Sequence, residues 1–249
     1  MPADVRRVWD QLADAAMEVT DRFDPASVDD LPEPAGRWLR HAIAPQTPLR
    51  YCVELDQHGT INLGGWRPFR AEQVLTPSAG YLWAETTRLF GLPIRGYDLL
   101  CDDRAEVRHR ALNAITVARA HGPDLARSAG GRLAAEIVWV PAVALTSAVH
   151  WTPGDDSHVT AVISYKQWTH EVTLTVAPSG AVQRVSVPRW ARVGKQPWRT
   201  YLFEALLHEE ATFDGYTVPV RTTAGYDLNP ARPADSSFIT QVIDSASYR

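Results

Sequence analysis

The hydrophobic pattern changes to a period of two at residue 49, and this change constrains the fold more than any other feature. In the segment LRYCVELDQHG, apolar residues alternate with more polar ones from Leu49 to Leu55, and a turn follows at His58-Gly59. This alternation is typical of a strand that buries one face. Similar runs fill most of the chain, so strands do not alternate regularly with helices. The pattern therefore argues against a doubly wound α/β fold.

Three helical segments accompany the strands. Residues 3–23 place apolar side chains at spacings of three and four, which predicts an amphipathic helix. A second, short helix is expected over residues 37–43, after the proline-rich LPEPAG. Residues 122–145, GPDLARSAGGRLAAEIVWVPAVAL, predict a helical insert between two sets of strands. Within it, Gly130-Gly131 predicts a kink or a close approach to another part of the chain.

These segments together predict one domain, mainly β with some helix (α+β). The expected fold is a long, curved antiparallel sheet, or half-barrel, with the helical insert capping its concave face. Such a sheet encloses a cavity if its inner side chains do not fill it. The predicted divisions of the single domain 1–249 are a helical N-terminal segment (1–45), first strands (48–120), the insert (122–145) and a second set of strands (146–247).

Charge and hydropathy exclude several classes of function. The net charge is −4, and acidic and basic residues are interspersed without a basic run of five or more. Nucleic-acid binding needs a basic stripe, so no nucleic acid is expected as a partner. The sequence contains neither the apolar core of a signal peptide nor the roughly 18 apolar residues of a membrane span. We therefore expect a cytoplasmic protein without a transmembrane segment, and the oligomeric state stays open.

Familiar catalytic and cofactor motifs are missing from the sequence. It contains no GxGxxG, GxxxxGK[ST] or GxSxG. His208-Glu209 resembles the start of a zinc-binding HExxH, but Thr212 stands where the second histidine would be. Cys52 and Cys101 form neither a CxxC pair nor a zinc spacing. We therefore expect no cofactor and no metal ligands.

An aromatic surplus is the clearest remaining signal, with nine tryptophans in 249 residues. Aromatic side chains can line an apolar pocket or simply pack a core, and the sequence leaves both open. The candidate substrate-binding residues lie in or beside the predicted sheet and its insert: Trp66, Phe69, Tyr81, Trp83, Tyr97, Arg108 and Trp139.

Charged residues amid apolar ones give the candidate catalytic groups. Glu136 lies inside the apolar run LAAEIVWVP. A buried carboxylate must be paired, accept hydrogen bonds or have a raised pKa, so Glu136 is either a structural anchor or a general acid or base. Glu85 is a second candidate of this kind, and Arg95 could stabilise developing negative charge. Arg108 and Arg110 share one face of their strand, where they could meet a glutamate or an anionic ligand.

Four segments of the chain carry a family resemblance. They are Trp66-Arg67-Pro68-Phe69 through Gln73, the insert itself, His150-Trp151 through Asp155-Asp156, and Trp198 with GYTVP at 215–219. Together they resemble an uncharacterised bacterial family, a domain of unknown function common in actinobacteria, over about residues 31–228. The resemblance implies no particular activity. It names as motif positions Trp66, Phe69, Gln73, Glu136, Trp139 and Pro141.

The order of elements also resembles the half-barrel of LolA-type lipoprotein carriers, which hold acyl chains in a concave apolar sheet. We interpret the chain as binding a hydrophobic small molecule or lipid-like substrate in an aromatic-lined cavity. The alternative is a cofactor-independent enzyme, a cyclase, isomerase or dehydratase with Glu136 as acid or base, acting on a hydrophobic natural-product intermediate. The third hypothesis is a scaffold whose pocket is filled by its own side chains.

Overall fold

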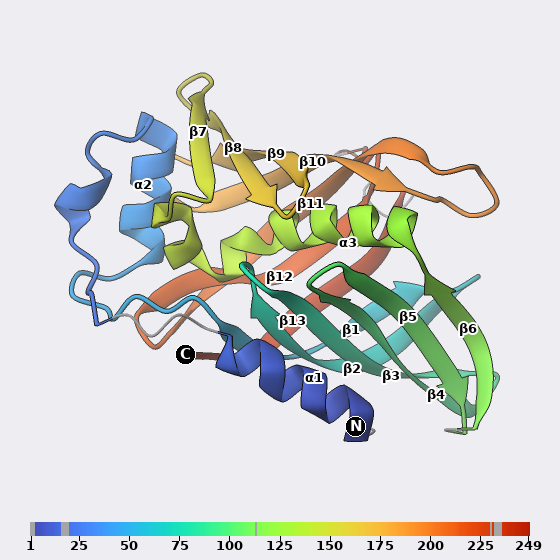
Figure 1. The fold of residues 1–249 in the computed structure, drawn as a ribbon. Helices are drawn as coiled ribbons and strands as arrows, with labels where there is room; N and C mark the ends of the chain where they lie inside the picture. The colour runs from blue at the N-terminus through green and yellow to red at the C-terminus, as the bar shows by residue number, and fades with distance from the viewer. Residues whose placement is uncertain (1–2, 16–19, 113, 230, 232–235) are drawn as a thin grey trace.

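A single curled antiparallel sheet organises the molecule (Figure 1). The computed structural model describes residues 3–15, 20–112, 114–229, 231 and 236–249. Its strands are β1 (Val53–Asn62), β2 (Trp66–Thr76), β3 (Gly80–Leu89), β4 (Leu92–Cys101), β5 (Arg104–Ala111), β6 (Ile115–His121), β7 (Val149–Pro153), β8 (His158–Tyr165), β9 (Trp168–Val176), β10 (Val182–Ala191), β11 (Arg199–Phe213), β12 (Tyr216–Tyr226) and β13 (Ser237–Tyr248). The predicted mainly β half-barrel is confirmed.

The strand order explains why the sheet curls around an insert. In the described part of the chain, thirteen strands lie in the order β6-β5-β4-β3-β2-β1-β13-β12-β11-β10-β9-β8-β7. The first and last strands therefore pair at the centre, and two meanders extend outward from them. The two free edges, β6 and β7, are consecutive in sequence, so the segment between them must cross from one edge to the other.

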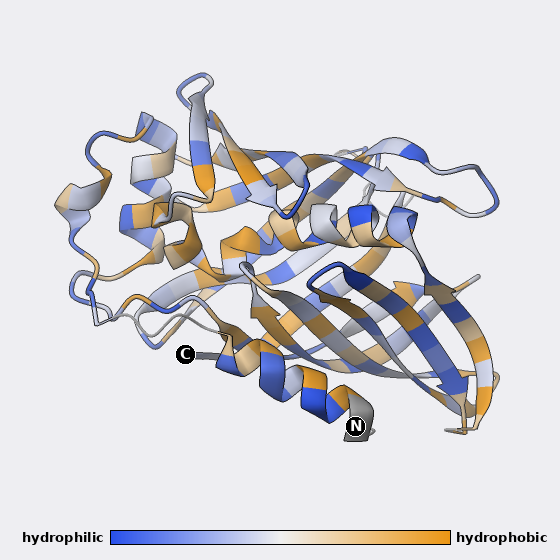
Figure 2. Cartoon of the chain, in the orientation of Figure 1, coloured by the Kyte–Doolittle hydropathy of each residue, from blue (hydrophilic) through white to orange (hydrophobic). Residues whose placement is uncertain are grey.

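The crossing segment is the predicted helical insert. It consists of α3 (Pro123–Ala135) followed by two short 3-10 helices, η2 (Glu136–Trp139) and η3 (Pro141–Leu145). α3 contacts β9 and β10 of one meander and β3 to β6 of the other, so it lies inside the curl. Its inner residues join a continuous apolar core with the facing strands. Figure 2 shows the corresponding alternation of apolar and polar residues along the strands.

The glycine pair Gly130-Gly131 lets α3 approach the sheet closely. A Cβ atom on Gly130 would lie 2.9 Å from Nε2 of His170, and one on Gly131 would lie 3.0 Å from Cγ of Arg189. Each distance is too short for a comfortable contact. The helix continues through both glycines without a break, so they provide close packing against β9 and β10 rather than a kink.

The remaining helices precede the sheet. They are α1 (Ala3–Asp14), the 3-10 helix η1 (Pro25–Val28) and α2 (Glu33–Ala42). α1 covers the outer face of β2 and β3, where Val5, Trp9 and Leu12 form a second apolar cluster with strand residues. Among the helices that the structure describes, none is long and apolar enough to cross a bilayer.

The first helix is shorter than the 3–23 predicted from its pattern. Residues 16–19 lie outside the described residues, and residues 20–23 are not helical. Instead, the backbone N–H of Phe23 donates to Thr47, and that of Leu49 donates to Asp21. The helical spacing was misleading at this end because extended pairing with residues 46–49 satisfies these backbone groups. The second helix begins four residues earlier than expected.

The two meanders also touch across the open side of the curl. The hydroxyl of Tyr165, before the β8–β9 turn, lies 3.0 Å from the carbonyl oxygen of Ala79 and 2.9 Å from that of Asp102. Next to it, Nζ of Lys166 lies 3.0 Å from Oδ1 of Asp102. This contact, which we call the clasp, joins the β8–β9 turn to the β2–β3 and β4–β5 turns.

We expect Tyr165→Phe to lower the free energy of unfolding by about 1 kcal/mol, because one hydrogen-bond donor of the clasp is lost from a buried site. Urea denaturation measures the change. Lys166→Gln is the matched control, since its exposed ion pair with Asp102 contributes only about 0–1 kcal/mol. A Tyr165→Phe variant as stable as the wild type would show that the clasp adds nothing to stability.

Candidate functional site

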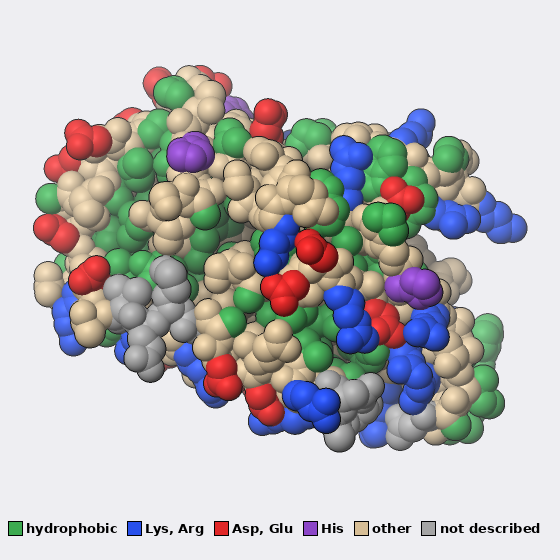
Figure 3. All heavy atoms as spheres, in the orientation of Figure 1, with side chains coloured by type: hydrophobic (Ala, Val, Ile, Leu, Met, Phe, Trp, Pro, Cys, Tyr) green, Lys and Arg blue, Asp and Glu red, His purple; other side chains and the backbone are tan. Residues whose placement is uncertain are grey.

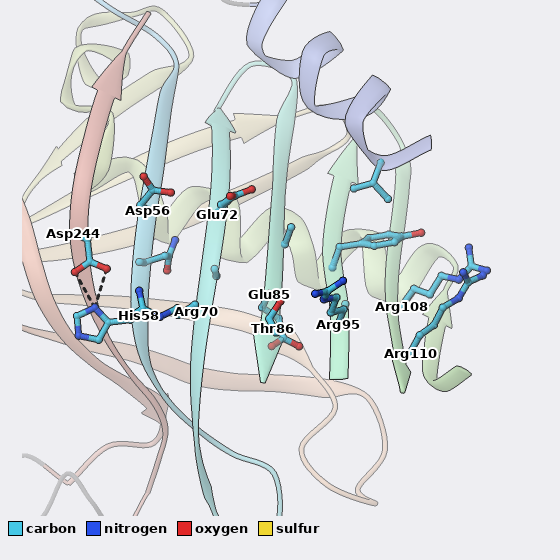
Figure 4. Close-up of a pocket in the computed structure, with 16 residues that line it drawn as sticks. Asp56, His58, Arg70, Glu72, Glu85, Thr86, Arg95, Arg108, Arg110 and Asp244 are labelled. Atoms are coloured by element: carbon cyan, nitrogen blue, oxygen red, sulfur yellow. Dashed lines mark hydrogen bonds and ion pairs between the residues drawn. The ribbon is translucent and has the colours of Figure 1, made fainter. Parts of the chain in front are cut away.

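A trench of about 1090 Å³ crosses the outer face of β1 to β5 (Figure 4). Two rows of side chains border it, and each row follows directly paired positions on successive strands. The row nearer α1 consists of Asp56, Glu72, Ala84, Tyr97 and Arg108. The other row consists of His58, Arg70, Thr86, Arg95 and Arg110. Between the rows, Gln57, Ala71, Glu85 and Gly96 line the trench.

Charge is divided along the trench. At its β1 end lie the carboxylates of Asp56 and Glu72, together with Asp244, whose Oδ1 is 2.8 Å from Nδ1 of His58. At its β5 end lie Arg95, Arg108 and Arg110. The trench therefore has an acidic end and a basic end, and Figure 4 shows the labelled groups in this arrangement.

The basic end holds three arginines that form no ion pair with a described carboxylate. Arg95 and Arg110 are directly opposite each other on adjacent strands, and Arg108 lies two residues along the same face. Like charges in this position destabilise a sheet. Among the ion pairs of the described residues, none involves Arg70, Arg95, Arg108 or Arg110. The Nε atoms of Arg108 and Arg110 are buried without a hydrogen-bond partner.

The inner face of the sheet holds a different, fully paired set of charges around Glu136. Its Oε1 accepts from Nε of Arg132 and its Oε2 from Nε2 of Gln73, each at 2.7 Å. Gln73 in turn accepts from Gln57 at 3.0 Å, and Arg132 reaches Asp98 at 3.1 Å. Burial opposes the charge of Arg132, but Glu136, Tyr81 and Asp98 together outweigh it and raise the pKa of Arg132 above its ordinary value. These contacts are those of a structural anchor between insert and sheet.

A second pair joins Glu85, which lies between the two rows of the trench, to His109 on the inner face. Nε2 of His109 lies 3.0 Å from Oε1 of Glu85, while Oε2 of Glu85 is buried without a hydrogen-bond partner. Burial lowers the pKa of His109, but the hydrogen bond to Glu85 and the charges of Asp98 and Glu85 outweigh it, so the pKa of His109 lies above its ordinary 6.5.

The aromatic residues predicted to line a cavity pack tightly instead. Phe69 and Trp83 meet edge to face with ring centres 5.5 Å apart, and the guanidinium of Arg132 lies 4.6 Å from the ring centre of Tyr81. Trp139 donates from Nε1 to the carbonyl oxygen of Pro219 at 3.0 Å. None of these four aromatic side chains is more than 5% exposed. Neither this trench nor a second pocket of about 680 Å³ beside β6 is lined by them.

The structure thus divides the ten predicted site residues among three places. Arg95 and Arg108 lie on the outer face and Glu136 on the inner side, so the sheet separates the two charged groups that a shared active site would need. Sequence reasoning missed Arg70 and Thr86, which only the strand registers bring into line with Arg95. The inner group is Phe69, Tyr81, Trp83, Glu85, Glu136 and Trp139; the outer group is Arg95, Tyr97 and Arg108; Trp66 lies, 38% exposed, at the start of β2.

One family model matches this chain in sequence, and two solved structures are similar to it in part of their fold. The model of a family of unknown function, DUF6544, matches residues 21–233. The LolA superfamily protein NE2245 from Nitrosomonas europaea is similar in structure, with a TM-score of 0.44 and 9% identity over 87% of this chain and 92% of that one. A domain from Vibrio parahaemolyticus, named for outer membrane lipoprotein sorting, has a TM-score of 0.39 and 6% identity over 80% and 85%. Curated protein sequences gave no match. The predicted resemblance to a domain of unknown function is confirmed.

We expect Glu136→Gln to lower the free energy of unfolding by about 3 kcal/mol, because it leaves Arg132 buried with one carboxylate partner fewer. Urea denaturation measures the loss. Glu33→Gln, which removes the exposed partner of Arg37, is the control and should change stability by less than about 1 kcal/mol. An equally small effect at Glu136 would contradict its role as an anchor.

The Glu85–His109 pair should make stability depend on pH. A pKa raised above the unfolded value of 6.5 means that folding favours the protonated histidine. The stabilisation is complete below pH 6.5 and is lost as the pH rises through the folded pKa. We expect His109→Gln to cost more stability below pH 6.5 than at alkaline pH, as measured by urea denaturation across that range. A cost that is independent of pH would refute the pairing.

Proposed function

We propose that this chain, which belongs to the DUF6544 family, binds an anionic lipid-like small molecule in the trench on the outer face of its sheet. One observation carries the proposal. Arg95 and Arg110 are held directly opposite each other with Arg108 beside them, and no described carboxylate pairs with any of the three. A bound carboxylate or phosphate would remove this repulsion and accept hydrogen bonds from the guanidinium groups.

The shape of the trench supports a small molecule with an apolar body. Its volume of about 1090 Å³ is close to the upper range, roughly 300–1,000 Å³, of small-molecule sites. Spanning five strands, it is about 19 Å long at the usual strand spacing. Val5, Ala84 and Tyr97 supply apolar surface along its side near α1. The carboxylates of Asp56 and Glu72 repel an anion from the other end, so the ligand would lie in one orientation.

The alternative function, a cofactor-independent enzyme with Glu136 as acid or base, has less support. Both carboxylate oxygens of Glu136 already accept hydrogen bonds, from Arg132 and Gln73. Arg95 lies on the other face of the sheet and does not face Glu136. The packing of Tyr81 and Trp83 under Arg132 likewise favours a structural role for the inner network.

Dodecyl phosphate is a suitable probe, with dodecyl maltoside as its uncharged counterpart. We expect the wild type to bind the phosphate more tightly, and Arg110→Gln to weaken that binding about tenfold or more, because charged hydrogen bonds contribute about 1.5–3 kcal/mol. Isothermal titration calorimetry measures both. Arg40→Gln, an exposed arginine of α2 paired with Asp29, is the control. Equal affinities for the two detergents, or an unchanged Arg110→Gln variant, would refute the proposal.

The same substitution should stabilise the folded protein. Arg110 lies directly opposite Arg95, and the repulsion between the two like charges destabilises the fold by about 0.2–1 kcal/mol. Replacing Arg110 removes this repulsion. We expect the gain at low ionic strength and its decline as salt screens the charges. Urea denaturation at two salt concentrations measures it. Destabilisation by Arg110→Gln would mean that this arginine serves the fold rather than a ligand.

A further inference from the structure

Exposed apolar side chains gather at one end of the sheet. The structure describes eight large hydrophobic residues with high exposure, and seven of them lie in or beside the β1–β2, β3–β4 and β5–β6 turns. They are Leu63 (46% exposed), Trp66 (38%), Phe90 (89%), Leu92 (47%), Leu112 (56%), Ile115 (64%) and Val117 (51%). Alternate turns of a meander lie at the same end, so these side chains share one end, which we call the apolar tip.

Turn chemistry does not explain these residues. Phe90 has φ 50° and Leu112 has φ 52°, the left-handed conformation that glycine and asparagine adopt most readily. Bulky side chains at such positions cost stability and project into water. Monomeric proteins rarely expose apolar patches of this kind without an interaction to make. The positions of Phe90 and Leu112 therefore indicate a binding role for the apolar tip.

The segments that form the tip carry only positive charge. Segments 61–71, 86–97 and 107–123 together contain seven arginines and no aspartate or glutamate, although the whole chain has a net charge of −4. Four of the seven also line the trench, and Arg67, Arg88 and Arg119 do not. The β10–β11 turn reaches toward the same end of the molecule, and residues 189–203 add three arginines and Lys195, again without an acidic residue. Figure 3 shows Lys and Arg side chains gathered over this end, with apolar side chains at its margin.

We infer that the apolar tip docks on the surface of an anionic lipid bilayer. Separate protruding turns, rather than a groove or a flat face, suit insertion between lipid headgroups. The aromatic and aliphatic side chains would enter the boundary between headgroups and acyl chains, while arginines such as Arg67 and Arg88 contact lipid phosphates. This surface is distinct from the trench, and the inference does not require the trench to hold a ligand.

Vesicle co-sedimentation tests the docking. We expect the wild type to bind vesicles of phosphatidylcholine with phosphatidylglycerol, to bind phosphatidylcholine vesicles much more weakly, and to be released by salt. Phe90→Ser combined with Leu112→Ser should weaken binding at least about tenfold, since buried apolar area is lost. Phe90→Leu should retain binding. Arg88→Gln should weaken it about fivefold, and Arg40→Gln, far from the tip on α2, should leave it unchanged.

Three results would overturn the inference. One is failure of the wild type to bind anionic vesicles. Another is binding that persists in the Phe90→Ser, Leu112→Ser variant when circular dichroism shows the variant folded. The third is wild-type self-association in sedimentation velocity that this variant abolishes while no vesicle binding occurs, since the tip would then join copies of the chain. Both serines replace side chains more than half exposed, so the fold should tolerate them.

Discussion

The pairing of β1 with β13 is the constraint on which the rest of the structure depends. It runs from Val53 opposite Tyr248 to Ile61 opposite Ile239 and joins the first and last strands at the centre of the sheet. Each meander can then grow only outward, which leaves its last strand at a free edge. The insert must connect these edges, and a sheet that curls around it buries α3 on both sides. The position of Glu136 and its partners follows from this topology.

Charged side chains are paired on the inner face of the sheet, whereas several arginines on the outer face have no ion-pair partner among the described residues. Inside, where water is excluded, Glu136 and Arg132 are paired and hydrogen-bonded, because an isolated charge there would be too costly. Outside, water screens the repulsion between Arg95 and Arg110, so the chain tolerates it at a modest energetic cost. Positive charge that lacks a described carboxylate partner is therefore tolerated on the outer face of β4 and β5.

Much of the fold could be predicted from sequence, and less of the site. The period of two after residue 49 and the long apolar insert were enough for a half-barrel with a helical cap. Gly130-Gly131 predicted a kink or a close approach, and the structure shows the close approach. The spacing of Arg108 and Arg110 showed that they share a face. The local sequence pattern does not show that Arg95 lies on the same face, because this depends on the strand registers. Nor does it show which face α1 covers.

The clasp ties the two meanders together across the insert. Tyr165 bonds to residues 63 and 86 positions away in sequence, and α3 contacts both of the meanders that this bond connects. Once the hydroxyl of Tyr165 has met its two carbonyls, the helix is confined between the meanders. Opening this end of the curl to expose the insert therefore also breaks the hydrogen bonding of Tyr165, which couples the β8–β9 turn to the turns of the opposite meander.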